Sequence, residues 1–350
     1  MKESSKRIQF YISLTSYFFL SFAIFNPVFT QKNITVNLFF CFLSASLTTF
    51  CIFFLYLKSP FSISESSLFH KLFCVIGTII AVFSVLLLMT QVIKDTCYIA
   101  GKGVSKHYYI MLSLAVLAVS LYLCFNSEKG MYRFCFMAAI PVLVFIFSAL
   151  LPYFTVKGII FDVNGVRDAN VRSAIIHGCI SGLFFAFDSS LFIYCFKDCF
   201  KADLGFVRSG VASLISSFIL WCICISGVYL IFGKNLTMTL NDPLYALTKS
   251  FHGFDMTEAL SALRLFAFII KSSVYLYSCS LCIKKAFFHS YKHAMKTILP
   301  IVFALIPLIY LPFIFVSQKE YGSLQGLIYP CVIILSLIFT FFIILRKKDS

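Results

Sequence analysis

Hydrophobic residues along the chain fall into repeated apolar blocks that are separated by short polar segments. A helix of about 20 apolar residues is long enough to cross the hydrocarbon core of a bilayer. The pattern therefore predicts an all-α polytopic membrane protein with ten transmembrane helices. The predicted spans cover residues 8–29, 37–57, 71–93, 107–125, 132–152, 174–196, 208–232, 258–283, 297–317 and 325–345.

A polar loop at residues 153–173, which begins "YFTVKGIIFDVNGVRDANVR", divides the chain into two predicted halves. Residues 1–152 and 174–345 each contain five spans, and together they are expected to form a single integral membrane domain over residues 1–350. Because five is odd, the two halves must cross the membrane in opposite orientations, as in inverted-repeat transporters. The halves show no convincing sequence symmetry, so the 5+5 inverted repeat is predicted from the number and direction of the spans.

Composition and charge support the membrane class. Hydrophobic residues make up 60% of the chain and charged residues only 12%, whereas charged residues make up about a quarter of a soluble domain. The formal net charge of +15 does not indicate a nucleic-acid partner, because the basic residues lie in short segments between the spans. Most of them fall on the side that carries both termini, which the positive-inside rule places in the cytoplasm. The basic N-terminus precedes a long apolar run without a cleavage site, so we expect a retained first span.

Motifs for catalysis, redox chemistry and metal binding lack the context that they need. Most of the 14 cysteines lie within or at the ends of apolar runs, where Cys acts as a small hydrophobic residue. Cys279 and Cys282 form a CxxC outside the strand–helix context of a redox site. His289 and His293 are four residues apart without the Glu of HExxH. We therefore expect a protein that is not an enzyme and that uses no cofactor or metal.

Away from the span ends, four ionisable residues lie inside predicted spans: His177 and Asp188 in the sixth, and Arg264 and Lys271 in the eighth. A charge inside a bilayer costs a few kcal/mol or more unless it is paired, neutralised or hydrated. From the helical rise per residue, Lys271 lies near the middle of its span and Asp188 about 5 Å to the cytoplasmic side of its own, whereas Arg264 lies about 10 Å further out than Lys271. These depths predict an Asp188–Lys271 ion pair and disfavour an Asp188–Arg264 pair.

A stripe at helical spacing in the eighth span holds both of its charges among small or polar-tipped residues. It consists of Leu260, Arg264, Ala267, Lys271, Tyr275, Ser278 and Cys282. A charged face of a membrane helix points to the bundle interior or to a water-filled cavity, which makes Lys271 and Tyr275 candidates for a binding site. Two structural alternatives stay open: the ion pair only orients helices, or Arg264 extends to the outer interface near Glu258.

The sixth span begins with a G-x-x-x-G motif, Gly178 and Gly182, followed by "LFFAFDSS". This motif is typical of close helix packing. The alternative is that the helix unwinds after Gly182 and exposes its backbone to a ligand, as discontinuous helices do in transporters. The first span offers Ser16, Tyr17 and a late kink at Asn26-Pro27, but it contains no glycine.

The sequence from about residue 240 resembles one family. The segment "NDPLYALTKSFHGFDMTEALSALRLFAFIIKSSVYLYSCSLCIKKAF" is similar to the span-eight region of the endospore germination permeases, the B subunits of nutrient germinant receptors. That family belongs to the amino acid/polyamine/organocation transporter superfamily. The similarity rests on Pro243-Leu244-Tyr245, on Lys271 and on the Tyr275-Leu276-Tyr277 run.

The resemblance implies a fold of the sodium:leucine-symporter type with a small-molecule pocket between spans one, three, six and eight. It implies residence in the bacterial cytoplasmic (spore inner) membrane, beside an A subunit with soluble domains and a C-subunit lipoprotein. The expected function is nutrient sensing, in which an amino acid or similar small nutrient binds at mid-membrane and the signal passes to partner subunits. The expected ligand-binding residues are Ser16, Tyr17, Gly182, Asp188, Ser189, Lys271 and Tyr275, and the expected structural or coupling residues are His177, Gly178 and Arg264.

Two other functions remain open at this level. In a proton-coupled secondary transporter of amino acids or small organic cations, Asp188 or Lys271 would carry the coupling proton. In a non-transporting membrane scaffold there would be no ligand pocket, and the lack of glycine in the first span favours that alternative.

Overall fold

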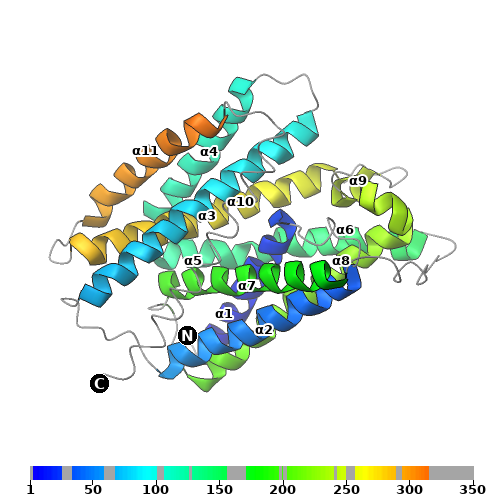
Figure 1. Cartoon of the computed structure of the whole chain (residues 1–350), viewed down its shortest axis with the longest axis horizontal. Helices are drawn as coiled ribbons and strands as arrows, with labels where there is room; N and C mark the ends of the chain where they lie inside the picture. The colour runs from blue at the N-terminus through cyan, green and yellow to red at the C-terminus, as the bar shows by residue number, and fades with distance from the viewer. Residues whose placement is uncertain are drawn as a thin grey trace. The chain divides into compact units, whose positions relative to one another are not determined.

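The computed structural model describes residues 3–25, 34–58, 68–100, 106–125, 128–155, 171–196, 199, 203–239, 243–249, 257–288 and 294–314. Within these ranges the secondary structure is helical and contains no strand (Figure 1). The helices are α1 (Glu3–Phe25), α2 (Ile34–Lys58), α3 (Leu68–Ala100), α4 (Lys106–Phe125), α5 (Glu128–Met137), α6 (Ala139–Thr155), α7 (Val171–Phe196), α8 (Leu204–Thr239), α9 (Pro243–Lys249), α10 (Thr257–Phe287) and α11 (Ala294–Ile314).

Several of these helices are long and apolar enough to cross a membrane. In the described part of the chain, six segments meet both criteria: Val36–Phe54, Cys74–Val92, Glu128–Phe147, Val171–Phe196, Leu204–Tyr229 and Leu260–Phe287. The chain is therefore an all-helical membrane protein in the ranges described. The first nine predicted spans all overlap described helices. The predicted tenth span, residues 325–345, and the predicted kink at Asn26-Pro27 lie outside the described residues.

The fifth predicted span differs from its prediction, because it consists of two helices, α5 and α6, that meet at Ala138. Pro141 explains the break: proline has no N–H, and its ring clashes with the carbonyl four residues earlier, at Met137. A backbone hydrogen bond runs from Val142 N to Ala138 O at the junction, at 3.3 Å. Apolar patterning alone marks the whole segment as one span and does not locate this break.

Two further features were not predicted. Residues Pro243–Lys249 form the short helix α9, which is too short to give a membrane-span pattern. In α8 the helical path is interrupted at Gly233, whose φ of 65° and ψ of 174° suit glycine and few other residues. The apolar part of α8 that is long enough to span a membrane, Leu204–Tyr229, ends before this glycine.

The chain divides into two compact units, each of which draws segments from both predicted halves. Unit 1 comprises Met1–Phe50, Cys135–Ala186 and Gly205–Ala267. Unit 2 comprises Cys51–Phe134, Phe187–Leu204 and Phe268–Ser350. Both compact units thus combine segments from before and after the loop of residues 153–173.

Unit 1 is organised around α1, which is buried by aromatic contacts on several sides. Phe22 of α1 lies 4.3 Å from Phe185 of α7, measured between ring centroids. The rings of Phe19 and Phe22 each lie 6.1 Å from Trp221 of α8. Phe19 also contacts Phe145 of α6 at 6.1 Å. This packing explains why Phe19 and Phe22 are buried rather than facing lipid.

Unit 2 contains α3, α4 and α11, which lie side by side (Figure 1), and most of α10. Small polar side chains join α4 to α10. The Ser120 hydroxyl donates to the Ile269 carbonyl at 3.1 Å, and the Cys124 thiol donates to the Ser273 carbonyl at 3.3 Å. These bonds fix the register between α4 and the part of α10 that carries Lys271.

Candidate functional site

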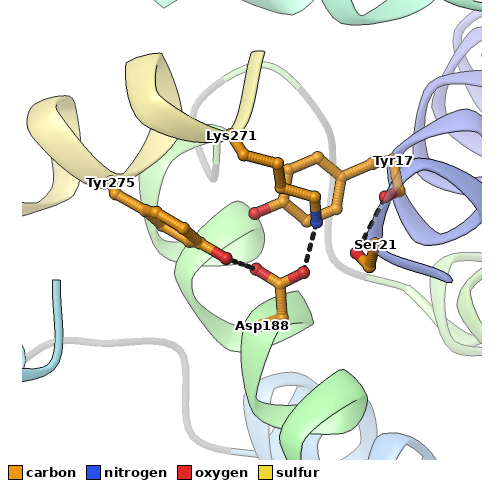
Figure 2. Close-up of polar contacts among 5 residues, drawn as sticks. All are labelled: Tyr17, Ser21, Asp188, Lys271 and Tyr275. Carbon is orange, nitrogen blue, oxygen red and sulfur yellow. Dashed lines mark hydrogen bonds and ion pairs between the residues drawn. The ribbon is translucent and has the colours of Figure 1, made fainter. Parts of the chain in front are cut away.

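Three polar side chains meet inside unit 2 on two membrane-length helices. Asp188 comes from the C-terminal part of α7, and Lys271 and Tyr275 come from α10 (Figure 2). The Lys271 ammonium forms an ion pair with Asp188 Oδ2, and the Tyr275 hydroxyl donates to Asp188 Oδ1 at 2.7 Å. The prediction of an Asp188–Lys271 pair from membrane depth is confirmed.

The local sequence explains why Lys271 and Tyr275 reach the same carboxylate. Residues four apart on a helix lie on one face, one turn above the other. The predicted stripe of α10 is buried at every position: Leu260, Arg264, Ala267, Lys271, Tyr275, Ser278 and Cys282. Each carboxylate oxygen of Asp188 therefore has its own donor on a single face of α10.

The ion pair is almost completely removed from solvent, with side-chain exposures of 0% for Lys271 and 1% for Asp188. Both residues also lie within segments long enough to span a membrane. A single charge in this setting costs a few kcal/mol, and a close partner offsets that cost only when hydrogen bonds satisfy the remaining lone pairs. The Tyr275 hydroxyl supplies such a bond to Asp188.

A second contact holds α7 against α10 beyond the ion pair. The Cys195 thiol lies 2.8 Å from the Ser278 hydroxyl and donates to the Val274 carbonyl at 3.4 Å. Cys195 lies seven residues after Asp188, and Ser278 seven after Lys271, so both contacts fall on the same pair of facing stripes. Hydrogen bonds from α10 to both α7 and α4 thus position the site.

The G-x-x-x-G motif of α7 serves helix packing within unit 1. A Cβ atom added at Gly182 would lie 2.2 Å from the Cys41 carbonyl oxygen of α2, and one at Gly178 would lie 2.5 Å from the Asn37 carbonyl oxygen. The Ser44 hydroxyl of α2 also donates to the Cys179 carbonyl at 3.1 Å. These contacts confirm the packing interpretation. The alternative, that the helix unwinds after Gly182, is not seen, because α7 is helical from Val171 to Phe196.

The other predicted site residues of α1 and α7 lie partly in unit 1 and partly in unit 2. Ser16 and Tyr17 are buried in α1, within unit 1, and the Tyr17 carbonyl accepts a hydrogen bond from Ser21 at 3.0 Å (Figure 2). Ser189 is buried next to Asp188 in unit 2. His177 is exposed on α7, within the segment long enough to span a membrane.

Arg264, in the unit 1 part of α10, is only 4% exposed. The alternative that Arg264 extends to the outer interface near Glu258 stays a prediction, because the Glu258 side chain lies outside the described part of the chain. The structure therefore brings together Asp188, Lys271 and Tyr275, with Ser189 adjacent. Ser16, Tyr17, His177, Gly178, Gly182 and Arg264 all belong to unit 1.

Sequence reasoning missed two partners at the site. It placed Tyr275 on the charged face but did not identify it as a donor to Asp188, although its spacing of four residues from Lys271 was the available signal. It did not identify the Cys195–Ser278 contact, because neither residue is charged and small polar residues in membrane helices leave no distinctive pattern.

Comparison with known proteins does not assign the chain to a family. No protein-family model matches the chain, and no curated protein matches it. The candidate site therefore stands on its own geometry: a buried carboxylate held by an ammonium and a phenol between two apolar helices.

Proposed function

We propose that the chain is a transporter-like, nutrient-sensing membrane subunit that binds a small nutrient such as an amino acid at mid-membrane and signals to partner subunits. One observation carries this proposal: the buried Asp188–Lys271–Tyr275 constellation lies within helices long enough to span a membrane. Ionisable groups at this depth are costly, and they mark ligand or ion sites more often than structural ones.

The composition of the two units supports the finer fold that we propose, ten spans arranged as a 5+5 inverted repeat. Unit 1 contains most of predicted spans one, two, six and seven, and unit 2 contains most of spans three, four, eight and nine. Each of the first four spans thus shares a unit with the span five places later, whereas most of the fifth span lies in unit 1 and the predicted tenth span lies outside the described residues. A pairwise assignment of this kind is what a repeated five-helix element would produce.

The proposed signal is a shift in helix packing. A ligand shifts an equilibrium between two arrangements only by its difference in affinity for them. Asp188 and Lys271 are suited to such a difference, because any movement of α7 against α10 changes the ion pair between them. In the germinant-receptor form of the proposal, the partners are an A subunit with soluble domains and a C-subunit lipoprotein in the spore inner membrane, and both termini of this chain are cytoplasmic.

The test uses tagged chain purified from native membranes of sporulating cells, with partners identified by mass spectrometry and germination of the same spores measured with nutrient mixtures. We expect co-purification of a membrane subunit with soluble domains and a lipoprotein. We also expect Lys271→Ala to abolish the nutrient response while the protein remains in the membrane. Lys129→Ala, at an exposed position on α5, is the matched control. A normal response in Lys271→Ala spores would remove the site from the mechanism.

Proton-coupled transport is the second candidate, and the bonding of Asp188 favours it. Its carboxylate contacts two groups that can exchange protons, the Lys271 ammonium and the Tyr275 hydroxyl, inside a buried site. Amino acid uptake into proteoliposomes under an imposed proton gradient tests this function. Gradient-driven uptake that is lost in Asp188→Asn would support it. A scaffold would be indicated instead if the chain were purified without partners and showed neither uptake nor nutrient binding.

A further inference from the structure

Helices α1 and α7 have no break that could hold an anion by its backbone. In transporters with discontinuous helices, the free N–H groups at a half-helix N-terminus hold the carboxylate of the substrate. Here α1 is helical throughout Glu3–Phe25 and α7 throughout Val171–Phe196. Backbone N–H groups inside such helices are bonded to carbonyls four residues earlier. A ligand carboxylate at the candidate site therefore finds no free backbone N–H group in the interior of α1 or α7, and a cationic side chain is the alternative donor.

Lys271 is the side chain that fits this need. In the described part of unit 2 it is the one buried cation, and Asp188 is the one buried carboxylate. The two are already paired with each other, and Asp188 Oδ1 has a second bond from the Tyr275 hydroxyl. A carboxylate side chain thus occupies the position at Lys271 that a ligand carboxylate would require.

We infer that the Asp188–Lys271 ion pair is an internal substitute for the ligand, which inserts between the two groups with its carboxylate on Lys271 and its ammonium on Asp188. The ion pair and the ligand-bound arrangement exclude each other. Tyr275 holds the Asp188 carboxylate in place when the ion pair opens. This inference rests on the proposed function, because it assumes that a small ligand enters this site.

Charge balance decides which ligands can replace the pair. The pair is neutral, and a low-dielectric site strongly disfavours any arrangement with a net charge. A ligand with one positive and one negative charge leaves the site neutral. A simple carboxylate adds one negative charge and a simple amine adds one positive charge, so both are disfavoured. The wild-type site therefore selects for zwitterions by the charges of Asp188 and Lys271.

The same reasoning predicts that single substitutions change the class of ligand. Asp188→Asn leaves one uncompensated positive charge, so a simple carboxylate should restore neutrality and bind better than a zwitterion. Lys271→Gln leaves one negative charge, so a simple amine should be preferred. The double variant Asp188→Asn/Lys271→Gln is neutral without any ligand and should lose the preference for zwitterions.

The experiment measures binding to purified protein in detergent, with any partners retained, by thermal shift and by isothermal titration. The probes are the twenty amino acids, and then the deaminated and decarboxylated analogues of each amino acid that binds. For wild-type protein we expect each analogue to bind at least about tenfold more weakly than its parent, as for the loss of one charge-assisted bond. We expect the order to reverse in favour of the acid for Asp188→Asn, and in favour of the amine for Lys271→Gln.

Two outcomes would overturn the inference. One is a double variant, folded by thermal unfolding, that binds the amino acid as tightly as wild type. The other is a pair of single variants that both keep the wild-type preference. If a single variant does not fold, the double variant still decides, because it buries no unpaired charge. Glucose and inosine are included as neutral nutrients. Binding of these alone would overturn the zwitterion mechanism while leaving the nutrient-sensing function intact.

Discussion

At the scale of single residues, the stability of the site depends on keeping its charges balanced. Removing one partner of a buried ion pair leaves the other charge uncompensated and typically costs about 3–5 kcal/mol. We expect Asp188→Asn or Lys271→Met alone to lower the thermal unfolding temperature markedly. The double variant should recover most of the loss, because it buries no charge. Thermal unfolding of detergent-purified protein gives the full double-mutant cycle.

Lys129→Met is the matched control for this cycle, because Lys129 is exposed on α5. An exposed charge contributes little to stability, so this variant should unfold within a degree or two of wild type. Additive losses in the double variant, equal to the sum of the two single losses, would contradict the coupling that the ion pair requires.

The hydroxyl of Tyr275 gives a second test at this scale. A hydrogen bond to a charged group contributes about 1.5–3 kcal/mol, and Tyr275→Phe removes the donor to Asp188 Oδ1 while keeping the ring. We therefore expect a loss of stability in that range, measured by thermal unfolding. Tyr277→Phe, two residues along the same helix and half-buried, should change stability much less. Equal losses of stability in the two variants would show that the Tyr275–Asp188 hydrogen bond contributes no more than an ordinary tyrosine hydroxyl does.

At the scale of helices, α2 and α7 approach each other too closely for a side chain at the α7 glycines. In Gly182→Ala the new methyl group would lie 2.2 Å from the Cys41 carbonyl oxygen, which is backbone and moves only with α2. Overpacking of this kind costs about 1–3 kcal/mol. We expect a lower unfolding temperature for Gly182→Ala and for Gly178→Ala. Ile176→Ala, at an exposed position on α7, is the control, and equal effects at all three positions would argue against the α2–α7 contact.

How far the elements follow from the sequence depends on the kind of signal. Apolar runs predict nine helical spans within the described residues, and the helical spacing of Lys271 and Tyr275 predicts the buried face of α10. The break at Ala138 was missed because residues on both sides are apolar, and the exposure of His177 does not follow from the apolar pattern, because burial depends on which helices pack nearby. Membrane depth identified the Asp188–Lys271 pair, since two opposite charges at similar depth have few other partners.

At the scale of the whole molecule, sequence patterns do not predict which helices pack together in each compact unit. Hydrophobic periodicity indicates which face of a helix is buried, but not which neighbour buries it. The division of the chain at the loop of residues 153–173 was a reasonable expectation from the polar composition of that loop. Each compact unit is built from segments of both predicted halves, and no sequence pattern indicates that combination.

This interleaving predicts that neither half of the chain folds alone. Unit 1 needs α1 and α2 from the first half and α8 from the second, and the rings of Phe19 and Phe22 join α1 to Trp221 of α8. A fragment of residues 1–160 should therefore be degraded when expressed alone, because α1 keeps its contact with Phe145 but loses those with Phe185 and Trp221. Co-expression with a fragment of residues 161–350 should restore a complex that survives detergent extraction and affinity purification.

Co-expression of the two fragments also serves as a control. It distinguishes the loss of packing partners from damage caused by cutting the loop. If cutting the 153–173 loop were itself harmful, the co-expressed fragments would fail to assemble, whereas interleaving predicts assembly through contacts such as that of Phe22 with Trp221. Weakening that contact by Trp221→Ala should reduce assembly of the two fragments more than it reduces the yield of the intact chain, because the covalent link keeps the halves together at high effective concentration. A protease-resistant fragment of residues 1–160 on its own would show instead that the first half is an independent folding unit, and the interleaved arrangement would then be wrong.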